Sequence, residues 1–102
     1  MKKPEKYKNY HCEDYFLSQK YVNGIYDEPS QLWVIIPAIE VEEDIENEFL
    51  VIGRPGFDGL QFGYRKHKKG LWVHYPIENE FTLLAPNIAT LADGWINGKI
   101  SV

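Results

Sequence analysis

Apolar and polar residues alternate most clearly in the middle of the chain. Apolar side chains occupy every second position over residues 60–65, and residues 71–75 (LWVHY) resume the apolar pattern after the polar segment 67–70. A period of two is typical of a strand with one buried face, and a polar segment that ends in glycine is typical of a turn between strands. The pattern therefore predicts a β-hairpin in which Trp72 and His74 share one face of the second strand.

Three further apolar runs predict strands, at residues 32–36 (LWVII), 49–52 (FLVI) and 81–85 (FTLLA). These runs are rich in β-branched and aromatic residues, which favour extended chain. Pro37 and Gly53 follow the first two runs and end them, because proline cannot donate to a ladder and glycine favours turns. Since strands that are consecutive in sequence usually pair, we expect an antiparallel meander.

The spacing of apolar residues predicts a helix at each end of the chain. Near the C-terminus Asn87 is a favoured N-cap, Gly98 a favoured stop, and Gly94 suggests close packing against a bulky group. Between the cap and the stop, apolar residues recur at helical spacing, namely Ile88, Leu91, Ala92, Trp95 and Ile96. Residues 10–20 show the same spacing less regularly.

These elements together predict an α+β fold, an antiparallel meandering sheet with an N-terminal helix and a C-terminal amphipathic helix packed on one face. The 102 residues correspond to one domain, 1–102, in which we expect residues 1–9 to be a frayed basic end. Cys12 is the only cysteine, so the chain cannot form an internal disulfide, and we expect it to be a core residue. Most of the three tryptophans should be core residues as well, with Trp72 as the possible exception.

Negative charge is concentrated in one segment. The net charge is −4, yet residues 40–48 hold six carboxylates, Glu40, Glu42, Glu43, Asp44, Glu46 and Glu48. The other residues together carry a slight positive charge, so the acidity is local and could steer a basic partner. Val41 and Ile45 are four apart, which fits one helical turn with both facing inward, and an irregular solvated connection fits equally well.

Several classes of site are not predicted. The glycines at 53, 56 and 59 lack the spacing and the following helix of a phosphate-binding loop, and the acidic segment lacks the pattern of a calcium loop. No nucleophile and base pair is apparent, so we expect no catalytic residue, no metal and no cofactor. The basic turn at 65–69 is too short to indicate direct nucleic-acid binding. No apolar run approaches the roughly 20 residues that span a membrane, which favours a cytoplasmic protein.

The segment FLVIGRPGFDGLQFGYR (49–65), extended by GLWVHY and by LLAPNIATLADGW, resembles the Smi/Knr-like or SUKH superfamily. The resemblance covers about half of the chain. It implies an α+β fold and, for many bacterial members, a role as an immunity protein that neutralises a toxin, often a nuclease. Such proteins are not enzymes.

The leading hypothesis is therefore a non-catalytic protein whose acidic segment binds a basic partner such as a nuclease toxin, as a carboxylate surface can occupy a basic cleft. The alternative is a small-ligand or peptide-binding module that uses the face of Trp72 and His74, provided that no helix covers this face. A scaffold protein that docks through a sheet edge is a third possibility.

Overall fold

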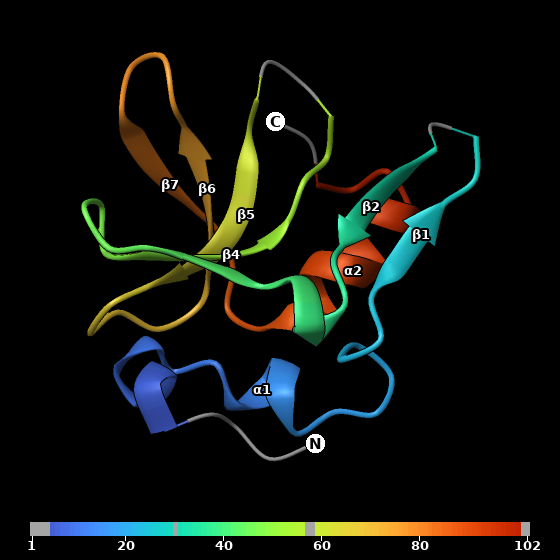
Figure 1. The fold of residues 1–102 in the computed structure, drawn as a ribbon. Helices are drawn as coiled ribbons and strands as arrows, with labels where there is room; N and C mark the ends of the chain where they lie inside the picture. The colour runs from blue at the N-terminus through green and yellow to red at the C-terminus, as the bar shows by residue number, and fades with distance from the viewer. Residues whose placement is uncertain (1–4, 30, 57–58, 101–102) are drawn as a thin grey trace.

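The central part of the fold is an antiparallel meander, as the sequence predicts (Figure 1). The structure is a computed structural model that describes residues 5–29, 31–56 and 59–100. In the described chain the main sheet has the order β3-β4-β5-β6-β7, with β3 (Glu42–Asp44), β4 (Phe49–Gly53), β5 (Gln61–Arg65), β6 (Leu71–Tyr75) and β7 (Glu80–Ala85). Strand order follows chain order, and every neighbouring pair is antiparallel. The hairpin and the strands at 49–52 and 81–85 are confirmed.

The strand predicted at 32–36 is also confirmed, but it pairs outside the main sheet. It forms a two-stranded ribbon from β1 (Ile25–Asp27) and β2 (Leu32–Ile35). Two backbone hydrogen bonds hold this ribbon against the end of β4: Ile36 N–H donates to the Ile52 carbonyl at 2.8 Å, and Arg54 N–H donates to the Trp33 carbonyl at 3.1 Å. The ribbon therefore lies along the same edge of β4 as β3: β3 pairs with the first residues of β4, and the ribbon contacts its end.

The N-terminal region differs from the prediction. The helix expected at 10–20 is reduced to one turn, α1 (Glu13–Phe16), and residues expected to fray form a 3-10 helix, η1 (Glu5–Tyr10). Tyr7 is buried and stacks on Phe16 with ring centroids 5.7 Å apart, which ties η1 to the core. His11 has a φ of 53°, and this left-handed residue separates the two helices. Residues 1–4 lie outside the described residues.

The C-terminal helix, α2 (Ile88–Ile96), has the predicted ends. The side chain of Asn87 accepts a hydrogen bond from Thr90 N–H at 2.8 Å, and Gly98 follows with a φ of 71°. A β-carbon on Gly94 would collide with the side chain of Ile100, which explains the glycine. The prediction that Ile96 lies on the buried stripe is wrong, because its side chain is 67% exposed at the last turn.

One core joins these helices to the sheet. It is built from η1, α1 and α2 on one side and from the inward side chains of the strands on the other, including Tyr15, Phe16, Leu50, Ile52, Phe62, Tyr64, Leu71, Val73, Ile88 and Leu91. Cys12 is fully buried in this core, as expected, and its thiol donates to the Tyr7 carbonyl. The sequence motif around Phe57 and Asp58 lies outside the described residues. The α+β architecture with helices on one face is confirmed.

Candidate binding surfaces

The acidic segment forms an edge of the main sheet and a turn. Glu42, Glu43 and Asp44 make up β3, Glu40 ends the short 3-10 helix η2 (Ala38–Glu40), and Glu46 and Glu48 lie in the turn to β4. The helical-turn alternative is therefore wrong, because the segment is extended where it pairs with β4. Ile45 points outward and is 79% exposed, whereas Val41 packs against the core.

Three of the six carboxylates have partners within the fold. Glu43 accepts a hydrogen bond from the Tyr10 hydroxyl at 2.7 Å, and Glu42 forms an ion pair with Arg54 at 3.2 Å. Asp44 accepts from the backbone and side-chain nitrogens of Asn47 and thereby shapes the turn. Burial, and then the carboxylate of Glu43, raises the pKa of Tyr10 above its usual range.

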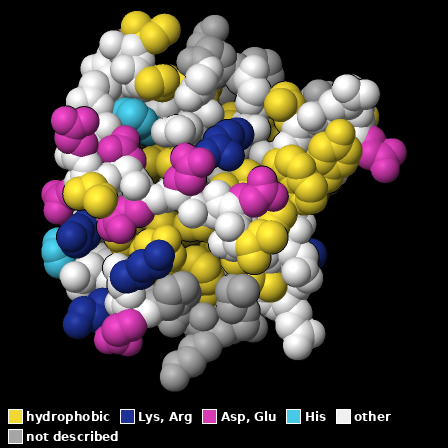
Figure 2. All heavy atoms as spheres, viewed as in Figure 1, with side chains coloured by type: hydrophobic (Ala, Val, Ile, Leu, Met, Phe, Trp, Pro, Cys, Tyr) yellow, Lys and Arg dark blue, Asp and Glu magenta, His cyan; other side chains and the backbone are white. Residues whose placement is uncertain are grey.

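The other three carboxylates, those of Glu40, Glu46 and Glu48, belong to exposed residues. Figure 2 shows acidic side chains across this face of the molecule, from its left side to a hydrophobic patch over β1 and β2 on the right. β3 is the last strand in the order of the described sheet, so its outer backbone edge is unpaired there. Exposed charge and an open strand edge thus occur together.

The predicted Trp72–His74 face lies on the side of the sheet opposite the helices, but side chains of the same face cover it and leave little of it accessible to a ligand. His74 is only 4% exposed and stacks on Phe81, with ring centroids 4.6 Å apart and an interplanar angle of 15°. The guanidinium of Arg65 lies 4.3 Å from the ring centroid of Phe81 and 4.8 Å from that of Trp72. An arginine of the chain itself therefore occupies the position that a ligand on this face would take.

Among the described residues, the imidazole ring of His74 has a hydrogen-bond partner at only one of its two nitrogens. Its Nε2 lies 2.9 Å from the Oδ1 of Asn79, which fits the tautomer with the proton on Nε2. Its Nδ1 is buried and has no hydrogen-bond partner among the described residues. The ring packs between Phe81 and Phe49, so its surroundings are those of an aromatic core residue.

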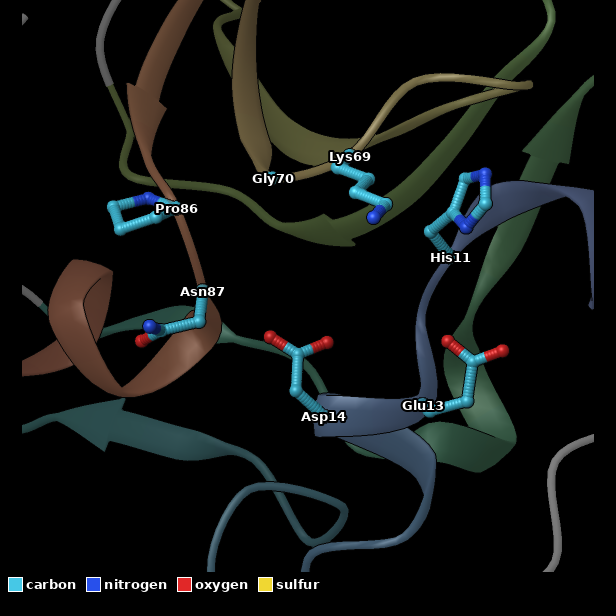
Figure 3. Close-up of a pocket in the computed structure, with 7 residues that line it drawn as sticks. All are labelled: His11, Glu13, Asp14, Lys69, Gly70, Pro86 and Asn87. Atoms are coloured by element: carbon cyan, nitrogen blue, oxygen red, sulfur yellow. The ribbon is translucent and has the colours of Figure 1, made fainter.

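A polar depression lies between α1, the β5–β6 turn and the start of α2 (Figure 3). It is lined by His11, Glu13, Asp14, Lys69, Gly70, Pro86 and Asn87. Asp14 accepts hydrogen bonds from the Tyr64 hydroxyl at 2.8 Å and from Ile88 N–H at 2.7 Å. A carboxylate of the chain therefore already occupies the anion-binding position at the N-terminus of α2.

The structure also contains an exposed aromatic pair that sequence reasoning missed. Tyr26 and Trp33 face each other across the β1–β2 ribbon with ring centroids 5.1 Å apart, and they are 45% and 37% exposed. The sequence suggested Trp72 as the exposed tryptophan, whereas Trp72 is half-buried under Arg65. The short strand β1 carries no clear pattern, so only the alternation of Trp33 with buried Val34 could have indicated an outward ring.

Comparisons with family models, with curated proteins and with solved structures found no match. The resemblance to the Smi/Knr-like superfamily therefore stays a prediction. Within the described ranges, no group of three or more His, Cys, Asp or Glu side chains is placed to hold a metal ion. In the same part of the chain, none of the helices has the length and apolar character needed to cross a membrane.

Proposed function

We propose that this chain is a non-catalytic, cytoplasmic binding protein that neutralises a basic protein, such as a nuclease toxin, through the acidic edge. The acidic edge is defined as residues 40–48. The observation that carries the proposal is the exposure of Glu40, Glu46 and Glu48 on either side of the edge strand β3, next to β3 carboxylates that bind Tyr10 and Arg54. A partner that binds nucleic acid offers the complementary positive cleft, and its substrate would compete for the same surface.

The internal contacts of the edge favour this role over a solvated charged loop. Tyr10 and Arg54 fix two β3 carboxylates, and the β3–β4 pairing fixes the backbone between them. A fixed array loses less conformational freedom on binding than a mobile segment does, so more of its electrostatic attraction contributes to affinity. The Trp72–His74 alternative has less support, because Arg65 already covers that face.

The test compares two variants with the same net charge. The edge variant carries Glu40→Gln, Glu46→Gln and Glu48→Gln, and the control variant carries Glu28→Gln, Glu78→Gln and Glu80→Gln, which replace three exposed carboxylates elsewhere. Wild-type protein would capture partners from the native cytoplasm, and the captured protein would be identified, purified and measured against all three forms by stopped-flow.

We expect a basic partner whose association at low salt slows at least about tenfold with the edge variant and about twofold or less with the control. The partner's nuclease activity should be inhibited by wild type and restored by added salt. Equal slowing by the two variants would mean that only net charge matters, and an acidic partner or a salt-independent rate would refute the acidic edge as the binding surface.

A further inference from the structure

The main sheet has a second open edge at β7, the strand at the other end of the strand order from β3. Among the described residues β6 is its only neighbouring strand (Figure 1), so one side of β7 lacks a ladder partner. The two edges differ in composition, because β3 consists of three acidic residues whereas residues 81–85 of β7 are uncharged. Charge on an edge strand discourages pairing with another strand, and its absence leaves β7 suited to such pairing. The β7 edge is defined as residues 80–85.

The strand registers determine which backbone groups of β7 face outward. Opposite residues in an antiparallel ladder alternate between hydrogen-bonded and non-hydrogen-bonded pairs. The hydrogen bond from Lys66 N–H to the Glu48 carbonyl sets this alternation for β4 and β5. Continued through the registers of β5 with β6 and of β6 with β7, the alternation makes Thr82 bond to β6. The N–H and C=O groups of Phe81 and Leu83 therefore point to the open edge.

The β7 edge is complementary to itself. When two copies lie antiparallel with a two-fold axis at Thr82, the outward N–H and C=O groups of Phe81 in one copy meet those of Leu83 in the other. The same pairing sets the Phe81 ring opposite the Leu83 side chain, which is 52% exposed and lies with Phe81 on the Trp72–His74 face. Apolar side chains in opposite positions stabilise an antiparallel pair of strands. Because this pairing uses both β7 edges, assembly stops at two copies.

The charges at the two ends of β7 favour the same arrangement. Exposed Glu80 begins β7, and exposed Glu78 lies in the turn before it. Exposed Lys68 and Lys69 lie in the turn that precedes β6, whose first residue pairs with the last residue of β7. Antiparallel pairing brings the acidic start of β7 in one copy next to the basic turn of the other, at both ends of the interface. Parallel pairing would instead place like charges together, which is destabilising.

We propose that two copies of this chain form an antiparallel dimer through their β7 edges. The proposal does not rest on the proposed function, because the acidic edge lies at the opposite end of the sheet order and stays exposed in such a dimer. The two main sheets become one continuous sheet with an acidic edge at each end. The dimer thereby presents two acidic edges to a partner.

Sedimentation velocity of the full chain between about 10 µM and about 1 mM tests the mass, which is 11.9 kDa for one copy and twice that for a dimer. We expect a dimer with a Kd of about 100 µM or below, since the interface is small. Leu83→Lys places a cation beside the guanidinium that lies over Phe81 of the other copy, and should weaken the dimer at least about tenfold. Ile39→Lys makes the same change at an 87% exposed side chain outside the main sheet, and should leave the Kd within about twofold. Equal urea unfolding midpoints would show that both variants fold.

Amide hydrogen exchange locates the interface. The N–H groups of Phe81 and Leu83 should exchange at least about threefold more slowly at about 1 mM protein than at about 50 µM, because only the dimer protects them. The amide of Glu43 on β3, at the other edge of the sheet, should exchange at the same rate at both concentrations.

A charge exchange tests the antiparallel arrangement. Glu78→Lys alone should weaken the dimer about threefold or more, and Lys68→Glu in addition should restore the Kd to within about twofold. A second substitution that restores nothing would overturn this arrangement. The mass of a single copy at about 1 mM would overturn the dimer and leave the β7 edge to a strand of a different protein. A dimer that Leu83→Lys leaves intact, or one in which the Phe81 and Leu83 amides gain no protection, would overturn β7 as the interface.

Discussion

Asp14 connects three distant parts of the chain, and its removal should destabilise the fold more than any exposed substitution. The residue lies on α1, but its two carboxylate oxygens accept hydrogen bonds from the Tyr64 hydroxyl on β5 and from Ile88 N–H at the start of α2. Tyr64 is fully buried. Burial, and then the charge and hydrogen bond of Asp14, raises the pKa of Tyr64 far above its usual range.

The expected magnitude follows from the two donors that Asp14→Ala would leave without an acceptor. A buried hydroxyl without a partner costs about 1–3 kcal/mol. The loss of a side-chain acceptor at a helix N-terminus costs about 1 kcal/mol. The variant should therefore lose about 2–4 kcal/mol of unfolding free energy, a large part of the 5–15 kcal/mol typical of a domain. Asp14→Asn keeps one acceptor oxygen and should lose about half as much.

Urea unfolding followed by tryptophan fluorescence would measure these values, with Asp93→Ala on the exposed side of α2 as the control. A double-mutant cycle with Tyr64→Phe isolates the contact. In Asp14→Ala the Tyr64 hydroxyl loses its acceptor, and Tyr64→Phe removes that hydroxyl. The double variant should therefore be about 1–2 kcal/mol more stable than additivity predicts. A loss within about 0.5 kcal/mol for Asp14→Ala, or strict additivity, would refute the reasoning.

Two further predictions concern the sheet and the buried phenols. Gly63→Ala would force a β-carbon into the Leu50 carbonyl of the paired strand and should cost about 3 kcal/mol, whereas Gly98→Ala faces open space and should cost only the roughly 1 kcal/mol of its left-handed backbone. Equal costs in urea unfolding would contradict the packing argument. Burial also raises the pKa of Tyr15 and Tyr64, so the folded state favours their neutral forms. The contribution of these two tyrosines to the free energy of unfolding should be constant below about pH 10, where unfolded tyrosine ionises, and should be lost as the pH rises above it. Urea unfolding midpoints that stay flat from about pH 9 to about pH 11 would contradict this.

The parts of the fold that the sequence predicted are those in which local pattern and tertiary packing agree. Residues 60–65 alternate because one face of β5 meets the core, and Asn87 and Gly98 end α2 because cap geometry is local. The N-terminal region has no such agreement. The left-handed backbone of His11 separates η1 from α1, and the aromatic contacts between η1 and α1 are tertiary, so a single helix was the wrong interpretation.

The binding surfaces were only half predictable for the same reason. Segment 40–48 was recognised from its charge, but the strand β3 within it was not, because three consecutive acidic residues have low strand propensity. They are extended because β4 offers an unpaired edge and because Tyr10 and Arg54 bind two of the carboxylates. Trp33 was assigned to the core, since nothing local shows that β2 leaves the main sheet.

Two positions suited to a ligand are already filled by side chains of the chain itself. Asp14 occupies the N-terminus of α2, and Arg65 covers the Trp72–His74 face. The acidic edge and the exposed Tyr26–Trp33 pair of the ribbon differ from both, since they carry exposed carboxylates and exposed rings. Both lie along one side of β4, the acidic edge beside its first residues and the ribbon beside its last. A partner that binds along this strand would meet both features at once, so the loss of either should leave weaker binding rather than none.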